Sequence, residues 1–303
     1  MSSESRSLVI LALIANSIIA VIKFVAAGIS GSSAMLAEGF HSVADTGNQL
    51  FLLRGTAVSR YAPDTRHPFG HGKELFFWSF MVAVVLFVGG SVVALLEGWE
   101  HVFHPEEPQN LALNLTVLGL AALFEYWIAF RPALKHFNQV RGGRGVMRTV
   151  REAKDPALLV VLFEDTAAIV GVVIAGSGVL LANITGNGRW DGAGSIMVGL
   201  LLAATAWILA FETKALLVGE AATREDRSSI RAASLAVPEL VSVGKLLTMH
   251  MGPDKILVNL EADFEDGLSD DQIEAAIDKV EAAIRAAVPS VGHIFVELQS
   301  PQR

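Results

Sequence analysis

The chain has 303 residues, of which 52% are hydrophobic, and its mean hydropathy is +0.49. These values are too apolar for an ordinary soluble domain of this size and favour a membrane protein. The net charge of -8 argues against nucleic-acid binding, and the absence of cysteine excludes disulfides and thiolate ligands. Any bound metal must therefore be held by histidine, carboxylate or other oxygen groups.

Six apolar segments are each long enough to cross ~30 Å of hydrocarbon, which takes about 20 helical residues. They are residues 8–28, 34–57, 75–96, 111–130, 157–181 and 193–218. The first apolar run is too long for a signal peptide, and no small-residue cleavage site precedes the second, so we expect a retained helix. The sequence predicts a bundle of six transmembrane helices.

Lysine and arginine gather in the loops that follow the second and fourth segments, residues 54–73 and 131–154. The loop over residues 97–109 carries acidic residues and neither lysine nor arginine. Because basic loops stay on the cytoplasmic side, both termini are expected in the cytoplasm. We expect an integral protein of a bacterial inner membrane.

Charged, soluble sequence begins after Gly219. A helix over residues 224–236, strands over 241–250 and 255–264, an amphipathic helix over 269–288 and a strand over 293–298 are predicted. Ser269 and Gln272 match a capping box at the start of the second helix. We therefore expect a transmembrane domain over residues 1–219 and a cytoplasmic αββαβ, ferredoxin-like domain over residues 220–303.

Ionisable and polar residues interrupt two of the apolar segments. His41 and Asp45 are four residues apart, so they share one helix face, and Asn48 extends that face by a turn. Glu164 and Asp165 lie in the fifth segment. Three carboxylates in hydrocarbon would cost roughly 8–10 kcal/mol without a partner, so a bound divalent cation is a natural explanation for them.

Metal binding is not the only interpretation of these polar residues, and the ligand set is open at Glu164. Helix packing through hydrogen bonds, or inert protonated carboxyls, would also account for the polar residues. Glu164 and Asp165 differ by ~100° around a helix, so only Asp165 is assigned to the ligand set and Glu164 is an optional member. Lys23 in the first segment is expected to extend toward the membrane interface and to leave the carboxylates unpaired.

The motifs FHSVADTGNQ, HPFGHGK and EDTAA, together with the αββαβ domain, resemble the cation diffusion facilitator family, closest to the zinc transporter nine branch. The resemblance covers nearly the whole chain. It implies a homodimer in the lipid bilayer that exports a divalent metal and exchanges it for protons.

The resemblance implies a transport site made of His41, Asp45 and Asp165. Zinc-selective bacterial members have histidine four residues before the fifth-span aspartate, whereas this chain has Val161 there. Glu164, Asn48 or water would then complete the site, so strict zinc selectivity is not expected.

A second site is implied in the loop DTRHPFGHGK, where Asp64, His67 and His71 follow the spacing D-x-x-H-x-x-x-H. These three ligands can converge if the loop folds back, although histidines that only bond to backbone are an equal alternative.

The resemblance also implies a metal pair at the cytoplasmic dimer interface, but this chain has Leu260 and Leu298 where those histidines would lie. His250 and His293 are interpreted as structural. The domain is therefore expected to dimerise without that metal cluster.

Zinc is the expected substrate, with manganese, iron or cobalt as alternatives, and no resident cofactor is expected. A membrane-anchored metal sensor is a different class of function with the same ligands. The triplet Asp45-Thr46-Gly47 matches an aspartic protease motif, but a membrane helix is the wrong context for it, so no enzyme is predicted.

Overall fold

The computed structural model describes residues 3–105, 110–143, 145–146, 149–150 and 156–299. The chain forms two compact units, one of residues 1–56 and 77–213 and the other of residues 57–76 and 214–303. The second unit thus takes up the loop between the second and third apolar segments. Each unit is described by itself.

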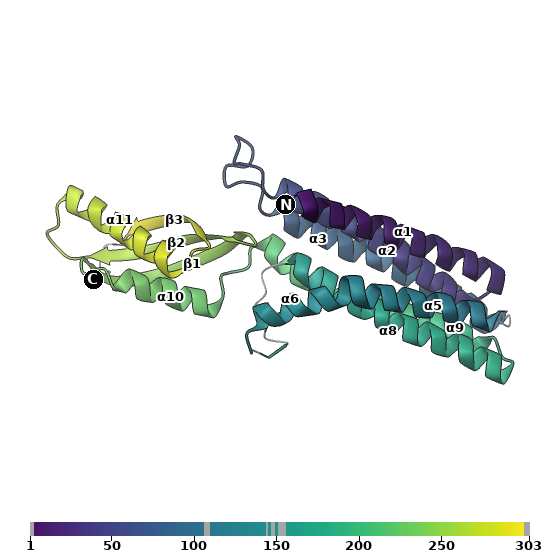
Figure 1. Ribbon diagram of the computed structural model, residues 1–303. Coiled ribbons are helices and arrows are strands. Elements are labelled where there is room, and N and C mark those ends of the chain that lie inside the picture. The colour runs from purple at the N-terminus through teal and green to yellow at the C-terminus, as the bar shows by residue number, and fades with distance from the viewer. Residues whose placement is uncertain (1–2, 106–109, 144, 147–148, 151–155, 300–303) are drawn as a thin grey trace. The chain divides into compact units, whose positions relative to one another are not determined.

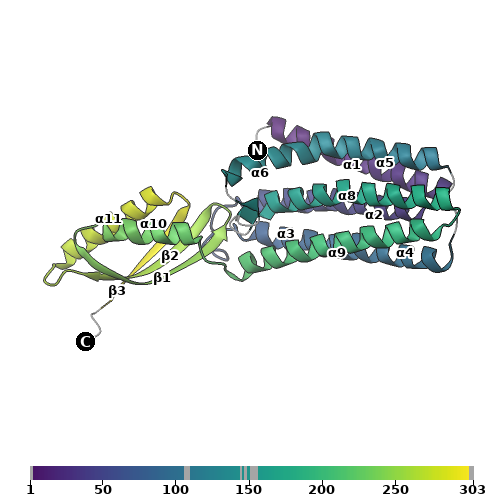
Figure 2. The ribbon, with the colours of Figure 1, turned by 90° about the horizontal axis from the view of Figure 1, so that it is seen from below.

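Long helices that run side by side make up the first unit (Figures 1 and 2). Their bounds are α1 Ser3–Ser30, α2 Ser33–Val58, α3 Glu74–Val85, α4 Val93–Phe103, α5 Leu111–Glu125, α6 Arg131–Arg141, α8 Pro156–Thr185 and α9 Arg189–Val218. Two π-helical segments interrupt the series: η1 Leu86–Val92 joins α3 to α4, and η2 Tyr126–Phe130 joins α5 to α6.

Four of these helical stretches are long and apolar enough to span a membrane within the described ranges: Glu74–Phe103, Leu111–Gln139, Pro156–Thr185 and Arg189–Val218. They match the last four predicted spans and extend beyond them. Helix α1 has a shorter apolar stretch, Asn16–Ser30. Helix α2 carries Glu38, Asp45 and Arg54 along its length, which lowers its hydropathy. The predicted number of six spans is therefore not confirmed.

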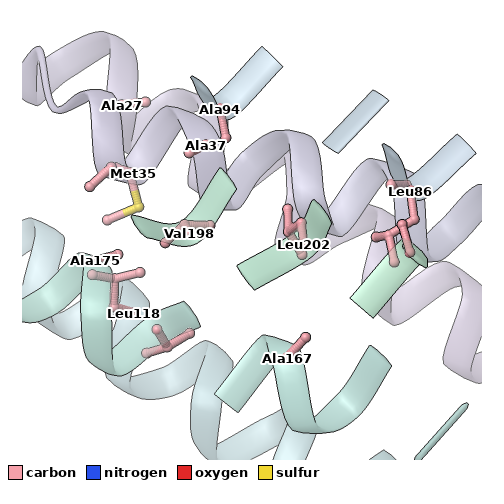
Figure 3. Packing of buried hydrophobic residues seen from close by; sticks show 14 of the residues in the cluster. Ala27, Met35, Ala37, Leu86, Ala94, Leu118, Ala167, Ala175, Val198 and Leu202 are labelled. Carbon is pink, nitrogen blue, oxygen red and sulfur yellow. The ribbon is translucent and has the colours of Figure 1, made fainter. Parts of the chain in front are cut away.

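Small and aliphatic side chains fill the interior of the bundle. Met35, Leu86, Val198 and Leu202 are fully buried, and Figure 3 shows them beside alanines of neighbouring helices. Glycines allow two of the helices to touch backbone to backbone, because a Cβ on Gly98 would lie only 2.7 Å from the carbonyl oxygen of Gly192. Helices α4 and α9 therefore pack closely at these glycines.

The second unit contains α10 Arg224–Leu235, β1 Leu240–Gly252, β2 Lys255–Phe264, α11 Asp270–Ala287 and β3 Val291–Leu298. The strands lie in the order β1-β2-β3, with β1 antiparallel and β3 parallel to β2. Both helices cover one face of the sheet (Figure 2). The predicted order αββαβ is confirmed.

Alternating apolar residues explain why this sheet and its helices pack together. Val258 and Leu260 of β2 and Val280 and Ile284 of α11 are fully buried in one core. Ser269 accepts a hydrogen bond from the backbone of Gln272, whose side chain accepts one from the Ser269 backbone. The predicted capping box is therefore present.

The loop before α3 packs against the end of the β1–β2 hairpin within the second unit. Gly72 lies so close to Met251 and Gly252 that a Cβ would clash with their backbone. Phe69 makes an edge contact with the ring of His293, at 5.3 Å between centroids. Gly70 has φ +89°, which favours glycine. The loop is therefore held in one shape by the sheet.

Candidate metal sites

A cavity of about 450 Å³ lies inside the helical bundle, between α1, α2, α5, α6 and α8. Four carboxylates from three helices line it: Asp45, Glu125, Glu164 and Asp165. Its other polar lining residues are Asn16, Ser42, Gln49 and His136. Among these residues, His136 of α6 is exposed to solvent.

His41 and Asp45 contribute several buried atoms that lack partners. The imidazole of His41 is fully buried, and its Nδ1 lies 3.5 Å from Asp45 Oδ1. Neither ring nitrogen forms a hydrogen bond with any described residue, and the same is true of Asp45 Oδ1 and Asp165 Oδ2. Buried polar atoms are normally paired, so these atoms are suited to bind a cation or water.

Glu164 faces the cavity as well, although it neighbours Asp165 in sequence. Its Oε1 accepts a hydrogen bond of 2.5 Å from Asn48 Nδ2, and both side chains are buried. Asn48 therefore stabilises Glu164. Val161 also lines the cavity and offers no ligand atom.

The residues predicted for the transport site are neighbours, but they do not form a closed ligand set. Zinc ligands in a tetrahedral site are about 3.5 Å from one another. Within the described ranges, His41, Asp45 and Asp165 do not bring one ligand atom each within 4.8 Å of the others. His41 is also not among the residues that line the cavity. Asp45, Asp165 and Glu164 share the cavity, and His41 is in contact with Asp45.

The loop residues Asp64, His67 and His71 do converge, with one ligand atom from each within 4.8 Å of the others. Asp64 Oδ1 lies 3.4 Å from His67 Nδ1, and Asp64 Oδ2 lies 3.2 Å from His71 Nε2. The backbone N–H groups of His67 and Arg66 donate to Asp64, and these bonds hold its pKa below its ordinary value. An ionised carboxylate beside two imidazoles is a suitable donor set for zinc.

Comparison with known proteins identifies the family of this chain. The cation efflux transmembrane domain matches residues 9–218, and the cytoplasmic domain of cation efflux proteins matches residues 222–300. The chain belongs to the cation efflux family. The predicted membership is thus confirmed, and the matched domain is one of transporters and not of enzymes.

Three relatives illustrate the range of this cation efflux family. Metal tolerance protein C4 of Arabidopsis thaliana is 34% identical over 75% of this chain and 50% of its own length. The mouse proton-coupled zinc antiporter SLC30A9, mitochondrial, is 28% identical over 85% and 46%. Manganese efflux system protein MneP of Bacillus subtilis is 32% identical over 61% and 57%. The chain spans about half the length of these curated relatives.

The expected position of Lys23 is wrong for this cation efflux protein. Its side chain does not extend to the interface but is fully buried, with Nζ 3.0 Å from Glu38 Oε2 and 3.5 Å from Glu125 Oε1. The expectation assumed that the long lysine side chain reaches the membrane interface. It failed because two carboxylates of other helices lie within ion-pair distance of the ammonium group.

Glu125 and His136 are cavity residues that the sequence interpretation did not select. Glu125 could have been found, since it is a carboxylate near the end of the fourth apolar segment, where an ionisable group is a functional signal. His136 lies in a basic helix, and nothing in that pattern distinguishes a cavity residue from a solvated one.

The cytoplasmic positions without histidine have ordinary structural surroundings. Leu260 is fully buried in the core, whereas Leu298 is exposed at the end of β3. His250 is buried in β1, and His293 packs against Phe69. The interpretation of both histidines as structural stays a prediction.

Proposed function

We propose that the chain is a divalent metal transporter that exports zinc from the cytoplasm in exchange for protons. The observation that carries the proposal is the cavity, which carboxylates of α2 and α8 line together and where buried ligand atoms have no hydrogen-bond partner within the described ranges. Family membership supports the same class of function.

The proposed mechanism is alternating access around His41, Asp45 and Asp165. Facing the cytoplasm, the deprotonated groups take up the metal. Facing outward, protons compete for the same imidazole and carboxylates and help to displace it, since metal and protons exclude one another on these groups. In the metal-bound state the ligand atoms must lie closer together than they do in this structure. An approach of α8 to α2 would bring Asp165 closer to His41 and Asp45.

We further propose a transmembrane domain over residues 1–219 with six spans and a cytoplasmic dimerisation domain over residues 220–303. Both termini would be cytoplasmic, and the protein would act as a homodimer. The expected bacterial inner membrane is part of this proposal, although the SLC30A9 relatives carry the word mitochondrial in their names. Asp64, His67 and His71 would bind a second zinc ion at the cytoplasmic surface.

Flux into proteoliposomes with an internal pH dye tests transport, selectivity and coupling together. Wild type should move zinc with a matching proton signal, whereas Asp45→Asn and Asp165→Asn should show neither. Glu100→Gln is the matched control, because Glu100 is an exposed carboxylate of α4 outside the cavity. Metal binding without flux in the wild type would favour a membrane-anchored sensor instead.

Manganese is a second candidate substrate. The cavity is rich in oxygen donors and has Val161 in the place of a second imidazole, and carboxylate-rich sites suit manganese better than zinc. One relative is named a manganese efflux protein. A metal panel in the same assay separates the two, because a zinc transporter should lose little zinc flux when manganese is added in equal amount.

A further inference from the structure

A buried ion-pair network adjoins the metal cavity, and the mechanism above does not use it. Lys23 of α1 lies between Glu38 of α2 and Glu125 of α5, at 3.0 and 3.5 Å from their carboxylate oxygens. Lys23 and Glu38 are both fully buried. Buried ion pairs add little to stability compared with apolar packing, so such a network invites a functional explanation.

The inner pair of this network, Lys23 and Glu38, is fixed by its hydrogen bond and by the packing of α8. Glu38 Oε2 accepts the hydrogen bond from Lys23, while its Oε1 points at Gly171 of α8. A Cβ on Gly171 would lie 2.6 Å from that oxygen, so only glycine leaves room for the carboxylate. The Lys23–Glu38 pair is therefore fixed in place by packing.

Glu125 is the outer member of the network and also part of the cavity wall. Its Oε1 is 3.5 Å from Lys23 Nζ, which is a long and weak contact. Its Oε2 is buried and has no hydrogen-bond partner in the described part of the chain. Glu125 lines the cavity together with Asp45 and Asp165, and its side chain is 12% exposed. One carboxylate thus faces both an ammonium group and the cavity.

The backbone next to Glu125 has an unusual form. The π-helical segment η2 begins at the following residue, Tyr126, where the regular helix α5 ends. Single π-helical turns are frequent at functional sites because they turn side chains away from their regular helical directions. The irregular backbone is consistent with a carboxylate placed for a ligand.

We propose that Glu125 is a further metal-binding residue of the cavity, and that Lys23 is a positioning residue that competes with the cation for its carboxylate. The inference rests on the proposed function, because it deepens the same site. Glu125 would supply the oxygen donor that Val161 does not, and it would come from a third helix. Lys23 would keep metal affinity low enough for release.

The test measures binding of Zn²⁺ and Mn²⁺ by calorimetry on the purified full chain in detergent. All variants carry Asp64→Asn and His71→Ala, which remove the loop ligands from the signal. Glu125→Gln should weaken binding at least about 10-fold, as losses of metal-supporting groups do. Co²⁺ gives a second readout, because loss of one oxygen ligand changes its visible absorption spectrum. Glu100→Gln is the control and should change neither measurement.

Substitution of Lys23 distinguishes competition from a structural role. If Lys23 competes with the metal, its removal should raise metal affinity, whereas Glu125→Gln should lower it. Lys23→Gln combined with Glu38→Gln removes one buried charge of each sign and should tighten binding by roughly tenfold, since the Glu125 carboxylate loses its ammonium competitor and is then free for the metal. In the Glu125→Gln background, the same two substitutions at Lys23 and Glu38 should not change metal affinity. A merely structural network would weaken binding in every variant.

Three results would overturn the inference. These are unchanged affinity and cobalt spectrum in Glu125→Gln, weaker binding after the paired Lys23 and Glu38 change, or tightening that persists without Glu125. If the wild type binds metal but moves none, the proposed transport fails while these binding results still decide the role of Glu125. Normal transport with an inert Glu125 would leave the proposed function standing and remove the inference.

Discussion

The replacement Gly171→Ala tests whether the packing of α8 fixes the buried carboxylate of Glu38. The new Cβ would lie 2.6 Å from Glu38 Oε1, so the carboxylate must retreat by about 0.8 Å to reach an ordinary contact of 3.4 Å. That movement disturbs its 3.0 Å bond to Lys23. Overpacking of this kind costs roughly 1–3 kcal/mol.

Thermal unfolding of the purified full chain in detergent measures the effect. At ~2–4 °C per kcal/mol, Gly171→Ala should lower Tm by roughly 2–12 °C. Gly176→Ala on the same helix is the matched control, because its Cβ would find ordinary contacts at 3.8 and 3.9 Å with Leu115 and Leu118. Alanine also favours the helix, so this control should keep or raise Tm.

Shortening the carboxylate supplies a rescue for the same experiment. Glu38→Asp added to Gly171→Ala withdraws the side chain by one methylene and should restore part of the lost Tm. Equal Tm values for Gly171→Ala and Gly176→Ala would refute the steric argument. So would a double variant less stable than Gly171→Ala alone.

Three further outcomes are expected. His41→Asp should lower zinc transport relative to manganese transport in proteoliposomes, because an all-oxygen site suits manganese, and an unchanged ratio would remove His41 from the ligands. Gly72→Ala should weaken calorimetric zinc binding by the loop with all three ligands intact, because its Cβ would clash with the backbone of Met251; equal binding would mean that the sheet does not shape the loop. The hydrogen bond from Lys279 lowers the pKa of Glu239 from its ordinary 4.5. Glu239→Gln should therefore reduce Tm at pH 7, and the difference in Tm from the wild type should disappear as the pH falls below the lowered pKa. A difference in Tm that persists in acid would contradict the stabilising ion pair.

Local patterns account for the elements that the sequence predicted well. The alternation in β2, the apolar stripe of α11 and the Ser269–Gln272 cap are each encoded within a few residues. The convergence of Asp64, His67 and His71 is equally local, since these ligands span eight residues of one loop. A proposal drawn from such short-range signals needs no knowledge of how distant helices meet.

The ion-pair network could not be predicted in the same way. Lys23 and Glu125 are 102 positions apart, and Lys23 and Glu38 belong to different helices. Helical periodicity gives the face of a residue but not the neighbour opposite it. The cost of buried carboxylates was therefore assigned wholly to a metal ion, although a lysine of the same bundle compensates part of it.

Charge balance in the bundle connects this network with proton exchange. Five carboxylates lie at the cavity or in the network: Glu38, Asp45, Glu125, Glu164 and Asp165. If all five were ionised, Lys23 would leave four charges uncompensated, and one divalent cation would remove only two. Uncompensated charge is costly in the low dielectric of a membrane, so this excess of carboxylates favours the binding of further cations. When the metal leaves, two more charges need compensation, and protons are the cations that these groups bind most readily. A site with this excess of carboxylates over lysine is therefore suited to exchange protons for metal, which supports the antiport in the proposed function.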